Sequence, residues 1–410
     1  MFKHTPDRKQ AMLLPPRIDD YVSATHRVRL IVEVVERLDL SNFKVGTADT
    51  GRAAFPPAAL VSLLLYSFSI GVFSAREMAR RLETDCAFLF ATSGLRPGYR
   101  TIARFRTDES EALASVFAKV VVVCREVGLG NLDVVAIDGT RVRANASLDA
   151  HTRRSQLEAE LAKAKEHVAK LLEEAGRVDA AEDLAARAPT EVPEPLAAPQ
   201  RRVVAIERAL AEMAATGREE VNTTDPDARI QRCKDGNRPG YNVQLAVSGT
   251  DGLIVACDVV NDAGDTAQLL PVADAVVAEV GPVGVVVADG GYNGGANVQG
   301  FVERNQDAVL AASTEKAFHE RARATGRFQW VDFAYDPNSE DRRARHFGVR
   351  RKAMIEGHFR YFKHNLRWRQ FLARGLQGCR AEFRLLATTY NLLKLALFRE
   401  RAAAAPVSPA

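Results

Sequence analysis

Residues 132–138 read LDVVAID, and residues 283–289 read VGVVVAD. Each is a short apolar run rich in valine or isoleucine, which is the pattern of a strand buried on both faces of a sheet. Each run ends in an acid followed by glycine, at Asp138-Gly139 and Asp289-Gly290. In open α/β sheets the carboxyl ends of neighbouring strands border one crevice. The sequence therefore predicts an α/β fold with both aspartates at one site.

The residues between and after these two strands predict the remainder of the sheet. Residues 241–261, YNVQLAVSGTDGLIVACDVVN, read as two strands joined by a Gly-Thr-Asp-Gly turn, and residues 307–313, DAVLAAS, read as a further strand. Helices are expected over residues 267–281 and 296–305. The order β, β, β, α, β, α, β, α is that of an RNase H-like mixed sheet flanked by helices.

A third acid, Glu356, lies in the basic helical stretch 349–365, VRRKAMIEGHFRYFKHN. Between Arg342 and Arg401 there are sixteen Lys or Arg and three acids, a net charge of +13, whereas the whole chain carries only +4. Lysine and arginine neutralise phosphates and release condensed counterions, so this segment indicates a polyanionic partner. A solvated helix face is the alternative explanation of such a charge run.

The three acids together indicate a divalent metal site. Mg²⁺ prefers hard oxygen ligands and takes one or two protein carboxylates. Asp138, Asp289 and Glu356 are therefore predicted to hold two ions, Mg²⁺ or Mn²⁺, with Asp138 bridging them, and to support an in-line phosphoryl displacement. Lys363, two helical turns after Glu356, is expected to contact a phosphate beside the metal. Taken singly, each aspartate also suits a turn or a helix cap.

Three neighbours of these acids have structural interpretations. Asp265 begins a capping-box sequence with Gln268, so we interpret it as a helix cap rather than a metal ligand. Tyr292 either stacks on a base or packs against the wall of the site, and packing is the favoured role. His358, two residues after Glu356, lies on a different helix face, which favours a phosphate or structural contact over metal binding.

Residues 1–128 are predicted to form a separate helical domain, because no strand alternation interrupts them. Ser74 is placed to cap one helix, and Gly94 and Pro97 suggest a turn before the next. The arrangement resembles a helix-turn-helix, although two plain helices of a bundle explain it equally well. The candidate DNA contacts in this domain are Arg76, Arg80, Arg100 and Arg104.

The predicted catalytic domain is interrupted by a helical hairpin at residues 151–220. Two amphipathic segments flank a proline-bearing linker there, while residues 129–150 and 221–402 supply the catalytic domain. The hairpin is interpreted as a solvated spacer, with dimerisation or DNA contact as the alternatives. Residues 403–410 are expected to form a disordered tail.

Cysteine usage and hydropathy bear on the compartment. The five cysteines are scattered and form no C-x-x-C pair, so neither a disulfide framework nor a zinc ribbon is indicated. The apolar segment 58–73 is short and interrupted by serines, which favours a buried helix over a membrane span. The N-terminus has no signal-peptide pattern. A reducing cytoplasm is the expected location.

Four blocks of the sequence resemble the DDE transposases of bacterial insertion sequences. AIDGTRVRANAS (136–147) is similar to the first-Asp motif of that family, and VVADGGYN (286–293) to its second-Asp motif. Residues 224–249 resemble its second-strand block, and residues 355–395 its last-Glu block, with six residues between Glu356 and Lys363. The helical N-terminus, with SAREMARRL and TIARFR, looks like the end-recognition domain of the family.

The sequence also departs from the family pattern. Lys352 stands where related members often have arginine. Lysine keeps the positive charge but cannot make the bidentate hydrogen bonds of a guanidinium group. Residues 333–343 lack the cysteines expected in many relatives.

The resemblance implies a transposase that binds the terminal inverted repeats of its element, hydrolyses a phosphodiester and joins the freed 3′ hydroxyl to target DNA. It implies a homodimer or higher oligomer on DNA, and a nucleoid association when bound. The alternatives are a metal-dependent endonuclease of the same fold without strand transfer and a decayed transposase that regulates by binding DNA. Further expected DNA contacts are Lys352, Arg360, Lys363 and Arg367.

Overall fold

A six-stranded mixed sheet forms the centre of the computed structural model, which describes residues 17–44, 54–182, 194–233, 236–310 and 353–404. Strands β5, β1, β7 and β8 are neighbours in that order, and both β4 and β6 pair with β5. β1 is antiparallel to β5 and parallel to β7, and β7 is parallel to β8, which confirms the predicted RNase H-like mixed sheet. The strands are β1 Val134–Arg143, β4 Arg229–Cys233, β5 Gly236–Ser248, β6 Ile254–Val260, β7 Val285–Ala288 and β8 Asp307–Leu310.

β1 is longer than the apolar run that predicts it. The strand continues five residues past Asp138 to Arg143, so the expectation that it ends at the acid was wrong. The reason is β5, which pairs with β1 all the way from Val135 to Arg143 and supplies hydrogen bonds regardless of side-chain polarity. The polar residues after Asp138 therefore belong to the sheet.

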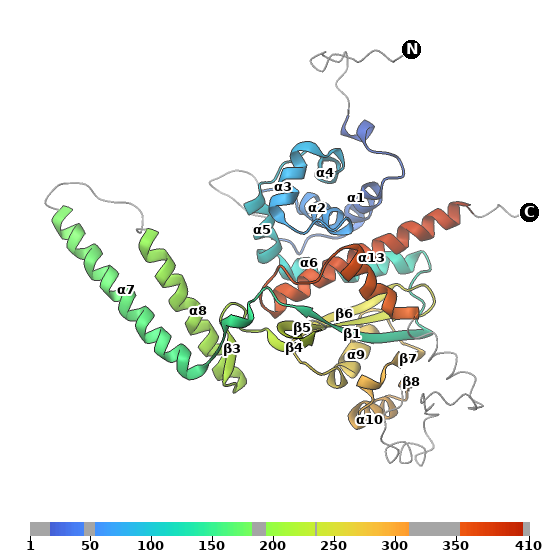
Figure 1. Ribbon diagram of the computed structural model, residues 1–410. Helices are drawn as coiled ribbons and strands as arrows, with labels where there is room; N and C mark the ends of the chain where they lie inside the picture. Colours follow the sequence, from blue (N-terminus) through green and yellow to red (C-terminus); the bar gives the residue numbers. More distant parts are fainter. Residues whose placement is uncertain (1–16, 45–53, 183–193, 234–235, 311–352, 405–410) are drawn as a thin grey trace, which may run out of the picture.

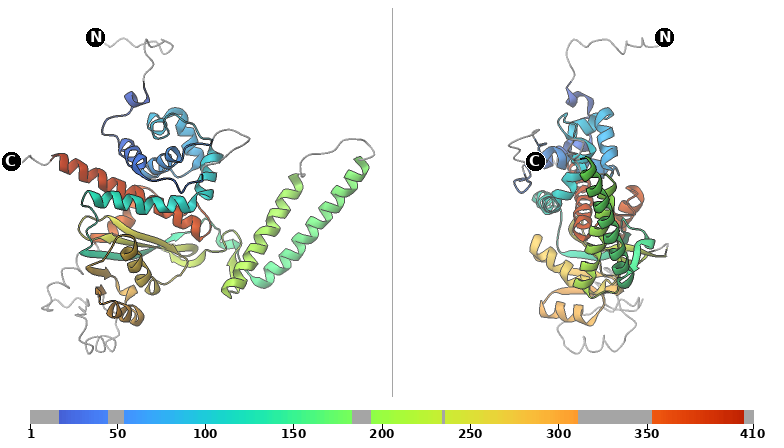
Figure 2. Two further views of the ribbon diagram at one scale, coloured as in Figure 1. Left: turned by 180° about the vertical axis from the view of Figure 1, so that it is seen from behind. Right: turned by 90° about the vertical axis from the view of Figure 1, so that its left-hand side faces the viewer.

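Helices cover both faces of the sheet (Figures 1 and 2). α6 (Ser110–Glu126) and α13 (Leu376–Ala404) lie side by side on one face, and α9 (Leu269–Glu279) and α10 (Gly295–Glu303) lie on the other. Asn391 of α13 is fully buried, and its amide bonds both the N–H and the C=O of Ile254 at 2.9 and 2.8 Å. The side chain thus satisfies a backbone edge of β6 that would otherwise be buried without partners.

Within the described residues, five α-helices precede α6 and pack above α13 (Figure 1): α1 Arg27–Arg37, α2 Pro57–Ser69, α3 Ala75–Thr84, α4 Cys86–Ala91 and α5 Tyr99–Asp108. α2 is buried around most of its circumference, as its continuous apolar sequence predicts, and it contacts both α1 and α13. Ser74 caps α3 by accepting from the Glu77 N–H at 3.5 Å, as expected. One continuous hydrophobic core joins these helices to the sheet.

The inserted hairpin projects from one end of the sheet (Figure 1). Its helices are α7 (Arg154–Glu182) and α8 (Glu194–Thr216), and the short antiparallel strands β2 (His151–Arg153) and β3 (Glu220–Asn222) close its base. α8 includes Pro199 in its second turn, so one backbone hydrogen bond of the helix is missing there. The hairpin has its own small core, formed by Leu157, Ile206, Ala209, Met213 and Val221.

Residues 353–360 form a helix that continues as a π-helical turn, η5 (Tyr361–Asn365). Phe362 is buried against the rings of Phe383 and Tyr390 of α13, with centroids 5.6 and 5.9 Å away, and against Trp368. This aromatic cluster fixes the helix that carries Glu356 to α13.

Short 3₁₀ helices complete the described chain: η1 Ile18–Tyr21, η2 Leu148–Ala150, η3 Thr266–Gln268 and η4 Gly290–Tyr292. The five cysteines all lie within the described residues, and no disulfide joins any two of them. No helix within the described ranges has the length and apolar character needed to span a bilayer. Lys352, most of the proposed tail and the end of the strand predicted over 307–313 lie outside the described residues.

Glu382 of α13 is a buried carboxylate that ties three parts of the chain together. It accepts hydrogen bonds from Trp368 Nε1 at 3.0 Å and from the backbone N–H of Leu372 and Ala373 at 3.1 and 2.7 Å. It also lies 3.5 Å from Arg106 of α5, whose side chain is only 16% exposed and donates to the carbonyl of Phe73. One side chain therefore joins the N-terminal helices to the loop that follows η5.

Replacing Glu382 with glutamine should destabilise the fold. The variant leaves the Arg106 guanidinium buried without its counter-charge, which costs on the order of 3 kcal/mol. Urea unfolding followed by circular dichroism measures the loss. Glu400→Gln, at an exposed position of the same helix, is the control and should stay within about 0.5 kcal/mol of wild type. Equal stability of the two variants would contradict the role of Glu382.

Candidate active site

The register of β1 and β7 places the two aspartates at corresponding positions. The parallel pairing ends with Ala136 opposite Val287, and Asp138 and Asp289 each lie two residues farther along. β7 ends at Ala288, whereas β1 continues. The sheet thus brings the two acids to the carboxyl end of the parallel pair, where the sequence placed them.

Asp289 begins the turn that follows β7. Its Oδ1 accepts from the Gly291 N–H at 2.9 Å and caps η4. Asn297 holds this turn from outside, because its amide donates to the carbonyls of Thr266 and Tyr292 at 2.6 and 2.7 Å. The carboxylate is therefore attached to a backbone that is fixed on both sides.

Asp265 lies at the centre of a polar network beside Gly139. Its Oδ1 accepts from Asn242 at 2.7 Å and from Gln244 at 3.2 Å, and its Oδ2 lies 2.7 Å from the guanidinium of Arg141. The side chain makes no capping hydrogen bond, so its interpretation as a helix cap was wrong. The local cap sequence is overridden by partners on β5 and β1, which lie about twenty or more residues away in the chain.

Tyr292 is fully buried, and its hydroxyl donates to Gln244 Oε1 at 2.5 Å. Burial raises the pKa of Tyr292, and the negative charges of Asp265, Asp138 and Asp289 raise the pKa further. Tyr292 therefore packs against the wall of the site, which is the role favoured from the sequence. All three carboxylates are close enough to influence its hydroxyl. His358 is also structural: it is buried, and its Nε2 lies 2.8 Å from the carbonyl of Gly252.

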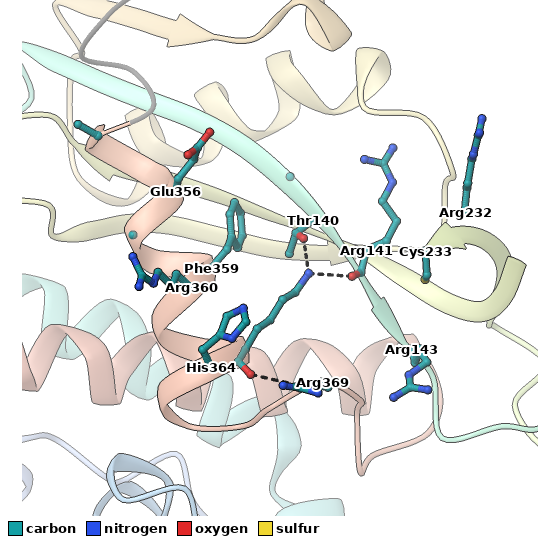
Figure 3. A pocket seen from close by; sticks show the side chains of 14 residues that line it. Thr140, Arg141, Arg143, Arg232, Cys233, Glu356, Phe359, Arg360, His364 and Arg369 are labelled. Atoms are coloured by element: carbon teal, nitrogen blue, oxygen red, sulfur yellow. Dashed lines mark hydrogen bonds between the residues drawn. The ribbon is translucent and has the colours of Figure 1, made fainter. Parts of the chain in front are cut away.

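A groove of about 1060 Å³ lies between the second half of β1 and the helix that bears Glu356. Figure 3 shows Glu356 and Phe359 on the helical wall and Thr140 and Arg141 on the strand. Lys363 crosses the groove, donating to Thr140 Oγ1 at 2.5 Å and to the Arg141 carbonyl at 3.1 Å. Side chains two apart on a strand share a face, so Asp138 points to the same side of β1 as Thr140.

The lining of this groove is strongly basic. It includes one acid, Glu356, and six lysines or arginines: Arg141, Arg143, Arg232, Arg360, Lys363 and Arg369. Arg367, also expected to contact DNA, is exposed just after η5 and is not among the lining residues. A groove with this charge balance suits a phosphate-bearing ligand.

The structure brings the predicted site residues together only in part. Asp138 and Asp289 are neighbours through the sheet, while Glu356 lines the groove next to Gly139 and Thr140. Within the described ranges, no three His, Cys, Asp or Glu side chains are grouped closely enough to hold a metal ion. Glu356 thus does not complete a three-carboxylate site with the aspartates in this structure.

The four arginines predicted as DNA contacts in the N-terminal helices fall into two pairs. Arg76 of α3 and Arg100 of α5 both lie against the ring of Tyr99, with guanidinium carbons 5.3 and 5.8 Å from its centroid. Arg80 pairs with Glu77 at 2.8 Å, and Arg104 lies 3.8 Å from Asp108. The first pair is therefore the better candidate for phosphate contact, because no described acid neutralises it.

Two family models match the chain. The Transposase DDE domain matches residues 200–392, and the Transposase domain (DUF772) matches residues 16–108. The chain belongs to the DDE transposases of insertion sequences. No curated protein and no solved structure matches it.

The two matched regions contain different parts of the predicted site. The first includes Asp289, Glu356 and Lys363, while Asp138 precedes it on β1. The second covers α1 to α5 and with them the four arginines. Transposases act on DNA, and this family generally uses divalent metal ions, in agreement with a basic groove beside paired carboxylates.

Sequence reasoning missed Arg141 and Asp265 as parts of the site. The spacing alone shows that Arg141, three residues after Asp138, lies on the opposite face of the strand and needs a partner there. Its partner is decided by the pairing of β5 with β1, which the sequence does not show.

Gly139 is the position where this network tolerates no side chain. A Cβ there would lie 2.5 Å from Gln244 Nε2, 2.9 Å from Asp265 Oδ1 and 3.0 Å from Tyr292 Oη. We expect Gly139→Ala to lower the free energy of unfolding by about 1–3 kcal/mol through overpacking.

Gly357→Ala is the matched control, because no atom lies within 4 Å of its Cβ position and the residue is helical. Alanine there should be neutral or stabilise by up to about 1 kcal/mol. Denaturant unfolding of both variants measures the difference, and a Gly139→Ala variant as stable as wild type would contradict the network.

Proposed function

We propose that this transposase binds the terminal inverted repeats of its element, hydrolyses a phosphodiester there and transfers the freed 3′ hydroxyl to target DNA. The observation that carries the proposal is that Asp138 and Asp289 occupy corresponding positions just beyond the paired part of two parallel strands, next to a groove lined by six cationic side chains. The family to which the chain belongs supports the same chemistry.

The donor set fits a divalent ion. Carboxylate oxygens are the ligands that Mg²⁺ and Mn²⁺ prefer, and Mg²⁺ commonly binds through one or two of them. We assign Asp138 and Asp289 as the fixed pair and Glu356 as the third ligand, supplied by the helix on the far side of the groove. Two ions bound there would activate the attacking water and stabilise the leaving oxygen.

The side chains of the groove have distinct roles in this proposal. Lys363, held at Thr140, is placed to bind a phosphate oxygen next to the aspartates. Arg360 binds the backbone nearby, and Lys352 and Arg367 are further contacts to DNA. Asp265 keeps Arg141 paired, so that this guanidinium does not neutralise the acids. No covalent protein intermediate is needed, since water and then the 3′ hydroxyl are the nucleophiles.

We further propose that the N-terminal helices recognise the element ends, that two or more copies act together on DNA, and that the protein works in the cytoplasm on the nucleoid. An endonuclease without strand transfer shares the first chemical step with this proposal. A joining assay on ends that have already been cut separates the two, because only a transposase inserts them into a target.

Removing any one of the three acids should abolish cutting and joining but leave DNA binding. The variants are Asp138→Asn, Asp289→Asn and Glu356→Gln, and each is expected to lower Mg²⁺-dependent cleavage of DNA bearing the element ends by at least about 100-fold. Asp274→Asn, at an exposed acid of α9 that pairs with Arg304, is the control. Full activity of any acid variant would remove that residue from the site.

Arg76 and Arg100 should contribute to end binding through phosphate contacts. Replacing both with alanine is expected to reduce the slope of log affinity against log salt by about 2, because each phosphate contact adds about 0.9. Fluorescence anisotropy over a salt series measures the slope. Arg37→Ala, on α1 and paired with Glu126, is the control. An unchanged slope in the double variant would exclude both arginines from the interface.

A further inference from the structure

A second hollow of about 370 Å³ adjoins the groove at Arg143, which lines both. It lies along residues 143–149, beyond the part of β1 that carries Asp138. Arg238 of β5 and Gln370 of the loop after η5 form its other walls. Groove and hollow thus adjoin at Arg143, along β1 and the residues that follow it, and the two together are called the track.

Three arginines of this track come from separate elements and have no carboxylate partner among the described residues. Arg232 lies on β4, Arg238 on β5 and Arg369 in the loop after η5, and none of them forms an ion pair with a described residue. The one acid of the hollow, Asp149, is turned toward Ser147, whose hydroxyl lies 3.3 Å from its carboxylate. Gathering guanidinium groups without counter-charges is unfavourable unless a polyanion binds between them.

The loop that carries Arg369 is fixed to β1 by its backbone. Phe371 donates its N–H to the Arg143 carbonyl at 2.9 Å, and the Gln370 side chain donates to the Ala144 carbonyl at 3.0 Å. Arg369 Nε also donates to the Lys363 carbonyl at 3.4 Å. The track is therefore a built surface whose walls are held in place before any ligand arrives.

The length of the track suits a nucleic-acid strand better than a small anion. Arg143 lies five residues beyond Asp138 on β1, which is about 17 Å along an extended strand. Along the axis of a duplex, a DNA strand rises about 3.4 Å per nucleotide, so a duplex whose axis follows β1 would place roughly five nucleotides over this distance. Several separated guanidinium groups match the repeated phosphates of such a strand.

We propose that the β4–β5 hairpin and the loop after η5 hold the DNA backbone for about five nucleotides on one side of the phosphodiester at Asp138 and Asp289. Arg232, Arg238 and Arg369 make the phosphate contacts, and Arg143 joins them to the catalytic groove. The position of the cut in this scheme rests on the proposed function. The contacts are to phosphates and carry no base sequence, so they hold DNA irrespective of its sequence.

The binding test uses a mixed-sequence 30-base-pair duplex and the full chain. Arg232→Ala with Arg238→Ala should lower the salt slope of binding by about 2 and weaken binding at least tenfold at low salt. The lysine pair at the same positions keeps the charge and should retain the wild-type slope. Arg201→Ala, at an exposed position of α8, should have no effect. A slope in the alanine pair equal to that of wild type would overturn the proposal.

The position of the track is tested by phosphate ethylation interference on DNA that the wild type cuts. Ethylation of about five consecutive phosphates on one side of the cut should block the wild type and affect the alanine pair much less. Equal interference on both sides in both proteins would overturn the proposal. If the salt slopes of the wild type and the alanine pair differ as expected but the wild type never cuts DNA, the proposed function fails while the track stands.

Discussion

The unequal pairing of β1 is the constraint on which the site depends. One edge of β1 is paired with β5 from Val135 to Arg143, whereas the other edge is paired with β7 only as far as Ala136. Gln370 forms a bridge on that second edge at Arg143. Between these points the edge faces the groove, and Lys363 donates to the Arg141 carbonyl there. A longer β7 would remove the groove and bury Asp138.

A second constraint keeps the helical wall of the groove in place. Glu382 binds Trp368 and the backbone at Leu372, so the loop after η5 cannot move without exposing a buried carboxylate. The same carboxylate binds Arg106 of α5. The N-terminal helices and the groove therefore share one buried polar contact, and a disturbance of α5 reaches the loop that carries Arg369 through a single side chain.

The sequence predicted the elements well because valine-rich strands and amphipathic helices are local patterns. The mixed sheet, the inserted hairpin and the buried α2 follow directly from them. The predictions that were wrong concern features fixed by contacts between residues far apart in the sequence. β1 continues past Asp138 because β5 lies beside it, and Asp265 binds Asn242 and Arg141 although its local sequence is that of a cap. The basic groove was anticipated only from its helical side, since Arg232 and Arg143 lie on strands far away in the chain.

Arg141 shows how carboxylates and cationic side chains lie next to each other at this site without neutralising one another. It follows Asp138 by three residues, so its side chain belongs to the opposite face of β1. There Asp265 pairs with it at 2.7 Å, and the carbonyl of Ala263 accepts from it at the same distance. The charge of Arg141 is thus compensated by Asp265 on the face of β1 away from Asp138. By holding Arg141, Asp265 keeps negative charge at the strand ends, while the cations along the groove remain directed at phosphate.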